Sequence, residues 1–246
     1  MKRAVVTGVS GGIGFAIAEV FCADGWEVIG FDRREPAEAL DGLTYVACDL
    51  GDSAAIAEAC AQTAAVGGLN ALVNNAAVQV NKGIGETTDA EWELVMNTNV
   101  RAAFICMREL LGALSTADGA IVNVSSVHAV ATSQNIGAYA ASKGALVALT
   151  RAAAVELAEQ GVRCNALLPG AVDTPMLRDG LSRRPHPDGP DGNLQILIDS
   201  TPLKMVASPT DIAKSVLFLA DTDRSPFITG QALIADGGAT AKLSTE

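Results

Sequence analysis

The sequence predicts one α/β domain in which helices cover both faces of a doubly wound parallel sheet. Three observations lead to this fold class. Short runs of β-branched and apolar residues alternate with longer Ala-rich segments of helical period, as in consecutive βαβ units. The length of 246 residues suits one such domain, with no internal repeat and no interdomain linker. Hydrophobic residues make up 49% of the chain, enough to fill a sizeable core.

Seven runs are predicted as strands, and all seven fit one sheet. They are residues 4–7, 27–31, 44–47, 71–74, 120–124, 162–167 and 232–234. Two of the intervening helices have clear start signals, because Thr88 and Ser208 each stand three residues before a carboxylate, the pattern of a capping box. Gly161 is expected to end the long helix that contains Tyr139.

One segment departs from this alternation. Three prolines and three glycines crowd together between about residues 178 and 202, around a short apolar patch at 194–198. We expect a long irregular connection here. Connections of this length in a compact domain are usually functional or mobile.

Composition and charge exclude several classes of protein. The chain carries 17 basic and 28 acidic residues, a formal net charge of −11, which argues against nucleic-acid binding and against a strongly acidic partner such as a carrier protein. No stretch has the length and apolarity of a membrane span, and the first residues lack the pattern of an export signal. The five cysteines form no C-x-x-C pair, so we expect reduced core thiols in a cytoplasmic protein. With two histidines, a histidine-based metal site is not expected.

The first predicted strand runs into a glycine-rich turn, Thr7-Gly8-Val9-Ser10-Gly11-Gly12-Ile13-Gly14, which leads into a helix. Backbone amides at such a helix start attract phosphate. The spacing is not the usual G-x-G-x-x-G, and a glycine-rich turn alone can be only a turn. Asp32 stands 18 residues beyond Gly14 at the end of the second strand, where dinucleotide-binding folds place a carboxylate on the adenosine ribose. An Asp at a strand end can equally be a turn residue.

A second group of polar residues lies further along the chain. Tyr139 and Lys143 are four residues apart on one helix, so their side chains share a face, and Ser126 lies just past the fifth strand. Asn99 lies within a helical segment. Considered alone, the Tyr–Lys pair is typical of two neighbouring residues on a helix surface. Asn99 alone is typical of the polar face of a helix.

Together these motifs make the chain resemble the short-chain dehydrogenase/reductase (SDR) family over almost its whole length. Further matching motifs follow the remaining strands: Asp49-Leu50, Asn74-Asn75-Ala76-Ala77, Pro169-Gly170-Ala171-Val172-Asp173-Thr174, and Ile228-Thr229-Gly230-Gln231 leading to Asp236-Gly237-Gly238. The chain departs from the family at Ala77, where Gly is more usual. Alanine is tolerated there if the backbone keeps an ordinary φ.

The resemblance implies a single Rossmann-type domain over residues 1–246, with a seven-stranded parallel sheet. It also implies hydride transfer between a nicotinamide cofactor and a secondary alcohol or ketone. In this family the residues at Asn99, Ser126, Tyr139 and Lys143 are catalytic. Tyr139 would be the acid/base, Ser126 would orient the substrate oxygen, and Asn99 would hold a water that links Lys143 to solvent. Lowering the phenol pKa from near 10 to about 7 requires roughly 4 kcal/mol, which Lys143 and an oxidised nicotinamide would supply.

The resemblance further implies a set of cofactor-binding residues: Gly8, Ser10, Gly11, Gly12, Ile13, Gly14, Asp32, Arg33, Asp49, Leu50, Asn75, Ala76, Ala77, Tyr139, Lys143, Pro169, Gly170, Val172 and Thr174. NAD is expected in preference to NADP, because Asp32 can accept both ribose hydroxyls and would repel a 2′-phosphate. Arg33 and Arg34 could instead attract that phosphate. No metal is expected.

The substrate is expected to be a small molecule lying under residues 176–206. His128, Gln134 and Asn135 suit a hydroxylated substrate such as a sugar, polyol or hydroxy acid. Three arginines (Arg178, Arg183 and Arg184) could meet a carboxylate, but aspartates alternate with them, which favours a solvated mixed-charge segment. Alternatives are an NADPH-dependent carbonyl reductase and a non-catalytic dinucleotide-binding module.

Assembly can also be predicted. The helix after Tyr139 mixes small residues with leucines on more than one face, and the family pairs this helix and the preceding one with those of a second subunit. A second contact through residues 211–234 would complete a homotetramer. The alternative is that the Ala-rich face packs only on its own sheet.

Overall fold

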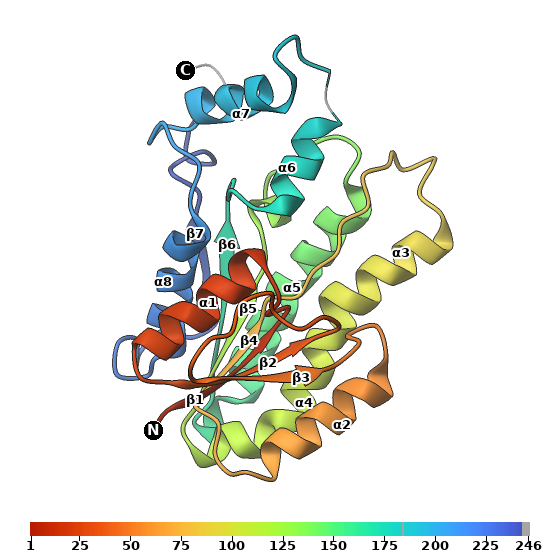
Figure 1. Ribbon diagram of the computed structural model, residues 1–246. Helices are drawn as coiled ribbons and strands as arrows, with labels where there is room; N and C mark the ends of the chain where they lie inside the picture. The colour runs from red at the N-terminus through yellow and green to blue at the C-terminus, as the bar shows by residue number, and fades with distance from the viewer. Residues whose placement is uncertain (184, 243–246) are drawn as a thin grey trace.

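A computed structural model describes residues 1–183 and 185–242 and confirms the predicted fold class. Seven parallel strands form one sheet in the order β3-β2-β1-β4-β5-β6-β7 (Figure 1). The strands are β1 (Arg3–Thr7), β2 (Glu27–Asp32), β3 (Leu43–Ala47), β4 (Ala71–Asn74), β5 (Ala120–Val124), β6 (Arg163–Pro169) and β7 (Ala232–Ala235). Each predicted strand end lies within two residues of the observed one.

The helices form two layers, one on each face of the sheet (Figure 1). They are α1 (Gly12–Ala23), α2 (Ser53–Ala64), α3 (Asp89–Met96), α4 (Ala102–Thr116), α5 (Gly137–Glu156), α6 (Pro175–Ser182), α7 (Gly189–Ser200) and α8 (Pro209–Ala220). Side chains alternate across the strands, so Val5 packs in the cluster with α2, α4 and α5 while Ala4 and Val6 pack with α1 and α8. Among the described residues, no helix has the length and apolarity needed to cross a membrane.

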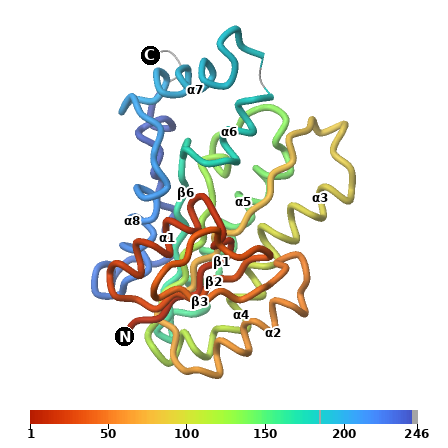
Figure 2. The backbone as a smooth tube through the Cα atoms, in the orientation of Figure 1, coloured from red at the N-terminus to blue at the C-terminus, as the bar shows by residue number. Residues whose placement is uncertain are grey.

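The strand order reverses between β1 and β4, the point where open α/β sheets bind ligands. β1 is followed by β2 and β3 on one side, whereas β4 lies on its other side. The segments after β4 and β6 extend beyond the sheet at the same end of the molecule (Figure 2). The fold thus places the predicted site motifs at one edge of the sheet.

The predicted helix caps are confirmed in two cases and corrected in a third. Thr88 and Ser208 both make complete capping boxes, with Glu91 and Asp211 respectively. Gly161 does have a left-handed φ of 75°, but it follows a short 3₁₀ turn (Ala158–Gln160) rather than α5 itself, which ends at Glu156.

The expectation of an irregular connection between residues 178 and 202 is wrong, because α6 and α7 occupy much of it. Thr174 caps α6, where its hydroxyl accepts from the Leu177 amide, and Pro175 is the first helical residue. Pro190 likewise lies in the first turn of α7. Proline at a helix start costs no hydrogen bond, so these prolines begin helices rather than interrupt them.

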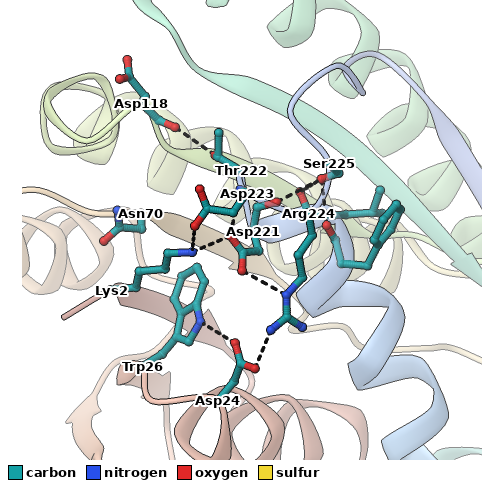
Figure 3. Close-up of polar contacts among 12 residues, drawn as sticks. Lys2, Asp24, Trp26, Asn70, Asp118, Asp221, Thr222, Asp223, Arg224 and Ser225 are labelled. Atoms are coloured by element: carbon teal, nitrogen blue, oxygen red, sulfur yellow. Dashed lines mark hydrogen bonds and ion pairs between the residues drawn. The ribbon is translucent and has the colours of Figure 1, made fainter.

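A network of charges joins the segment before β1 with the ends of α1 and α8 (Figure 3). Lys2 precedes β1, whereas the site motifs follow the carboxyl ends of the strands. Lys2, before β1, contacts the buried Asp221 at the end of α8 at 2.6 Å. Arg224 contacts Asp221 at 3.1 Å and Asp24, after α1, at 2.5 Å. The Trp26 indole also donates to Asp24 at 3.2 Å. These contacts fix the ends of α1 and α8 against each other.

Candidate active site

The glycine-rich turn leaves the start of α1 without a side-chain cap. Gly11 is the N-cap and offers no acceptor, and no acidic residue lies in the first turn of the helix. The first amides of α1 therefore have no side-chain partner, and the positive end of the helix dipole is not offset. This arrangement fits the diphosphate of a dinucleotide.

The turn is packed too closely for side chains at two of its glycines. A Cβ on Gly14 would lie 1.9 Å from the Gly8 carbonyl oxygen. Gly8 has a φ of +72°, and a Cβ there would lie 2.8 Å from the Cα of Ala76, after β4. The turn thus rests directly against the segment after β4, and side chains at these two positions are excluded.

Asp32 lies beside this turn, as the sequence predicts. Its carboxylate accepts from the Ser10 amide at 3.1 Å and from the Arg34 amide at 3.2 Å. The Ser10 hydroxyl also donates to the Arg34 carbonyl. Arg33 and Arg34 are exposed. A carboxylate, and not a guanidinium, therefore contacts the glycine turn.

The motif after β4 joins the two strand ends on either side of the reversal. The Asn75 side chain donates to the carbonyls of Thr7 and Gly8, at 3.0 and 3.3 Å. In return the Thr7 hydroxyl accepts from the amides of Asn75 and Ala76. Ala77 has no positive φ, so the condition for alanine at this position is met. Sequence reasoning missed Thr7, although its place directly before Gly8 was a signal.

The remaining predicted cofactor residues come from two further strand ends. After β3, Asp49 accepts from the Gly51 amide at 2.8 Å, and Leu50 is buried in the core. After β6, Gly170 donates to the Ala235 carbonyl at 2.9 Å. Thr174 reaches the glycine turn itself, because a Cβ on Gly12 would lie 3.5 Å from its methyl group. The segments after β1 and β6 are thus adjacent.

Three of the four predicted catalytic side chains come together between β5 and the first turns of α5. The Lys143 ammonium donates to the Val124 carbonyl at 2.8 Å and lies 5.5 Å from the centre of the Tyr139 ring. The Ser126 oxygen accepts from the His128 amide at 3.2 Å, and Ser126 also hydrogen-bonds the Tyr139 hydroxyl. Tyr139, Lys143 and Ser126 are all buried.

Burial sets the proton affinities of this group. It raises the pKa of Tyr139 to about 12, and the hydrogen bond from Ser126 acts in the opposite direction. Burial also lowers the pKa of Lys143 to about 7. The chain alone therefore does not give Tyr139 the lowered pKa that general-base action needs, because one partly protonated lysine does not offset the loss of solvation. A further positive charge next to the phenol is required.

Asn99, the fourth predicted catalytic residue, lies on a π-helical turn (Asn97–Arg101) between α3 and α4. Turns of this kind are frequent at functional sites. Its side chain is 2% exposed. The amide bonds both backbone groups of Val78, accepting from the N–H at 2.8 Å and donating to the carbonyl at 3.0 Å.

The same Asn99 amide also donates to the Ser142 hydroxyl at 3.0 Å, and Ser142 donates in turn to the Tyr139 carbonyl at 2.7 Å. This chain of bonds links Asn99 to the helix turn that carries Tyr139 and Lys143. Sequence reasoning missed Ser142. Its position next to Lys143 on the buried side of a helix was a weak signal.

The residues expected near the substrate are only partly brought together. The His128 ring lies edge-on to the Tyr139 ring, with centroids 5.9 Å apart. Gln134 and Asn135 are exposed on the segment before α5. Arg178 pairs with Asp173 and Asp191, and Arg183 pairs with Asp179, which confirms the mixed-charge interpretation for these two arginines. Arg184 lies outside the described residues.

The described residues contain no cluster of three or more His, Cys, Asp or Glu side chains suited to holding a metal ion. The site instead combines a bare helix start, a carboxylate beside it and a buried Tyr–Lys–Ser group. These are the parts needed to bind a dinucleotide and to move a proton next to it.

Comparisons with known proteins agree with this geometry. A family profile described as "Enoyl-(Acyl carrier protein) reductase" matches residues 8–240. The chain is 37% identical to galactitol 2-dehydrogenase (L-tagatose-forming) of Cereibacter sphaeroides, with 96% of this chain and 94% of that protein covered. It is 36% identical to 2-(R)-hydroxypropyl-CoM dehydrogenase of Xanthobacter autotrophicus, with 98% and 99% covered.

Among solved structures, the fold is similar to that of aldohexose dehydrogenase from Thermoplasma acidophilum in its ligand-free form. The TM-score is 0.91 at 30% sequence identity, and the match covers 99% of this chain and 95% of the other. The chain therefore belongs to the short-chain dehydrogenase/reductase family, whose nicotinamide-dependent oxidoreductases act on CH–OH groups.

Proposed function

We propose that this enzyme interconverts a secondary alcohol and a ketone on a small polyhydroxylated molecule, with Tyr139 as the acid/base. The observation that carries the proposal is the buried group of Tyr139, Lys143 and Ser126, which lies at the same end of the parallel sheet as the glycine-rich turn. A bound nicotinamide would supply the hydride acceptor or donor. The protein would position the substrate, stabilise the developing charge electrostatically and provide a path for the proton.

Each side chain has a distinct task in this mechanism. Tyr139 takes the alcohol proton from the substrate oxygen as the carbon loses its hydride, and returns it in the reductive direction. Ser126, which accepts from the His128 amide and lies at the Tyr139 hydroxyl, orients the substrate oxygen for this proton transfer. Protonated Lys143, 5.5 Å from the Tyr139 ring centre, stabilises the phenolate.

Asn99 is proposed to hold the water that connects Lys143 to solvent. Its side-chain oxygen accepts one hydrogen bond from Val78 and has a second lone pair available. The amide is fixed by Val78 and Ser142, so the direction of that lone pair is also fixed. The proposed role in orienting a water fits a rigid side chain better than a mobile one.

A sugar or polyol is the preferred substrate class. His128 lies against Tyr139, and its ring Nδ1 is 3.3 Å from the Thr132 hydroxyl, so polar groups border the reacting position. The two similar dehydrogenases named for galactitol and aldohexose act on polyhydroxylated compounds. The paired Arg178 and Arg183 are less suited to a substrate carboxylate. A carrier-bound acyl substrate is disfavoured by the net charge of −11.

NAD is the proposed cofactor, bound by the nineteen residues that the family resemblance implies. The Asp32 carboxylate at the glycine turn supports this choice, because it would repel a 2′-phosphate. A larger kcat/KM with NADP than with NAD would show that Arg33 and Arg34 attract the 2′-phosphate more strongly than Asp32 repels it. That outcome would favour the NADPH-dependent carbonyl reductase instead.

We propose a homotetramer in the cytoplasm. The exposed residues of α5 include Ala148, Ala152 and Val155, and Phe104 on α4 is 47% exposed beside a cavity of about 340 Å³. Phe218, Phe227, Leu233 and Ile234 are exposed on and around α8 and β7. Two separate apolar surfaces support two interfaces. Four of the five cysteines are buried, and none is paired, which suits a reducing compartment.

A substrate screen tests the function directly. The purified protein is mixed with NAD and a panel of sugars, polyols, hydroxy acids and simple secondary alcohols, and NADH formation is followed by absorbance. We expect turnover with one or more polyols or sugars. Binding of NADH without turnover of any alcohol or ketone would favour the non-catalytic module.

A further inference from the structure

The turn that follows β7 lies between the proposed cofactor site and the end of α7. Asp236 organises this turn through its carboxylate. One oxygen accepts from the Gly238 amide at 2.9 Å, and the other accepts from both the amide and the hydroxyl of Thr240 at 2.7 Å. Burial would raise the pKa of Asp236, but these hydrogen bonds hold it below its usual value. The turn is therefore fixed by an ionised, fully engaged side chain.

One side of this turn packs against the loop that carries Pro169 and Gly170. A Cβ on Gly170 would lie 2.7 Å from the Cβ of Asp236 and 2.8 Å from its Cα. The Gly170 amide also donates to the Ala235 carbonyl at 2.9 Å. Gly170 and Asp236 thus touch backbone to backbone, which anchors this side of the turn on the cofactor loop.

The other side of the turn carries the end of α7. The Leu203 amide donates to the Gly237 carbonyl at 3.2 Å. A Cβ on Gly237 would lie 2.8 Å from the methyl group of Thr201, and a Cβ on Gly238 would lie 3.2 Å from the ring of Pro202. Thr201 is 7% exposed, and its hydroxyl donates to the Leu197 carbonyl at 2.8 Å. It has little freedom to move away.

We propose that residues 236–240 are the seat of the substrate-covering segment, and that Asp236 is a positioning residue for substrate binding. The seat fixes residues 201–203 at a set distance from Gly170 in the proposed cofactor loop. The proposal rests on the proposed function, since it assumes that the segment after β6 covers the substrate. A displacement of about 1 Å at such a place can lower the rate by a large factor.

The chain offers a matched pair of glycines for the test, one at each end of β7. Gly237 and Gly230 both have positive φ, +63° and +72°, so alanine is strained at either position. At Gly230 the nearest atom to an added Cβ is the Ala154 methyl at 3.4 Å, an ordinary contact. Gly237→Ala therefore displaces the seat, whereas Gly230→Ala imposes the same kind of backbone strain without doing so.

The first readout is steady-state kinetics with the substrate found in the screen. We expect Gly237→Ala to raise the substrate KM by about tenfold or more, with the dissociation constant of NADH changed by less than about threefold. Gly230→Ala should lower the melting temperature to a similar extent and keep the substrate KM. Equal KM values for the wild type and Gly237→Ala, or equal increases in both variants, would overturn the proposal.

The second readout needs no substrate, so it separates this proposal from the proposed function. Hydrogen exchange of the peptide covering residues 194–204 is measured in the wild type, Gly237→Ala, Gly230→Ala and Asp236→Asn. Asp236→Asn keeps one acceptor oxygen and replaces the other with an NH2 donor, so it cannot satisfy the three donors of Gly238 and Thr240 and should loosen the seat without a steric clash. We expect faster exchange of this peptide in Gly237→Ala and Asp236→Asn only. Unchanged hydrogen exchange in both Gly237→Ala and Asp236→Asn would contradict the proposed seat, even if the screen had identified no substrate.

Discussion

The Tyr139 hydroxyl lies where burial opposes the charge that its proposed role creates. With a pKa raised to about 12 it holds its proton at neutral pH, so loss of that proton must be coupled to a nearby positive charge. The Lys143 ammonium lies 5.5 Å from the centre of the Tyr139 ring, and its own pKa is lowered to about 7. In the absence of ligand, Tyr139 therefore keeps its proton at neutral pH, whereas Lys143 is partly protonated.

Removing the Tyr139 hydroxyl tests its role. Tyr139→Phe should lower kcat by about 100-fold or more, because general acid–base catalysis typically contributes that much. NADH binding should stay within a few-fold, since the ring is kept. Tyr45 is the other tyrosine of the chain, and its hydroxyl donates to the Asp32 carbonyl. Tyr45→Phe is the control and should keep kcat. Substantial activity in Tyr139→Phe would refute the mechanism.

Lys143 should make the stability of the cofactor-free protein depend on pH. Its pKa is about 7 in the fold and 10.5 ordinarily, so between these values the unfolded chain holds a proton that the folded chain lacks. The free energy of unfolding should then rise with pH in this window, by at most about 1.4 kcal/mol per pH unit. Below pH 7 both states are protonated and the cost of the buried ammonium is fully present.

Urea unfolding of the wild type and Lys143→Met at pH 6, 7.5 and 9 measures this effect. Methionine has a similar length and no charge, so the variant should be more stable than the wild type at pH 6, and this advantage should be clearly smaller at pH 9. Other titrating groups cancel in the difference between the two proteins. A difference that does not change with pH would show that the ammonium is not desolvated.

At the scale of elements, the glycine turn and α1 form one packed unit with the ends of β1 and β4. A Cβ on Gly14 would lie 1.9 Å from the Gly8 carbonyl oxygen, whereas a Cβ on Gly11 would have no atom within 4 Å. Gly11 has extended backbone with a φ of 178°, which any residue adopts. The two positions are close in sequence but differ completely in the space around them.

This contrast gives a stability prediction. Gly14→Ala should destabilise the protein by about 1–3 kcal/mol, because overpacking outweighs the higher helix propensity of alanine. Gly11→Ala should change the free energy of unfolding by less than about 0.5 kcal/mol. Denaturant unfolding of the two variants beside the wild type decides the matter. Equal stabilities would mean that the turn can move away from β4.

The elements that sequence reasoning placed well are those whose signals are local. Strands β1 to β7 follow from short apolar runs bounded by turn residues, and Thr88 and Ser208 cap their helices through contacts three residues away. Helices α6 and α7 were missed because Pro175 and Pro190 stand at their starts, where proline supports a helix that elsewhere it would break. The presence of a proline therefore does not by itself show whether a helix begins or is interrupted at that residue.

The candidate site also combines contacts that follow from local spacing with contacts that depend on the tertiary fold. The spacing of Tyr139 and Lys143 fixes their shared helix face, so their proximity could be predicted. The bond from Asn99 to Ser142 spans 43 residues and depends on how α5 packs beside the π-helical turn. The bonds from Asn75 to Thr7 and Gly8 depend equally on strand order. No local pattern carries such information.

At the scale of the whole molecule, the exposed apolar surfaces support the proposed tetramer. Phe104 and Leu149 border the cavity between α4 and α5, and the exposed α5 residues Ala148 and Ala152 would let a second helix approach closely. The surface around α8 and β7 is separate from this one. Because each surface would pair with its own copy about a two-fold axis, the combination closes as a tetramer.

Light scattering coupled to gel filtration measures this assembly. The chain has a mass of 25.1 kDa, so the wild type should elute at roughly 100 kDa as four copies. Ala148→Glu places charge on the proposed α5 interface and should give a dimer at about half that mass, held by the remaining surface. Ala61→Glu introduces the same charge on an exposed position of α2 and should remain a tetramer. A wild-type mass near 25.1 kDa at micromolar concentration would refute the prediction, and would mean that the Ala-rich face of α5 serves only its own sheet.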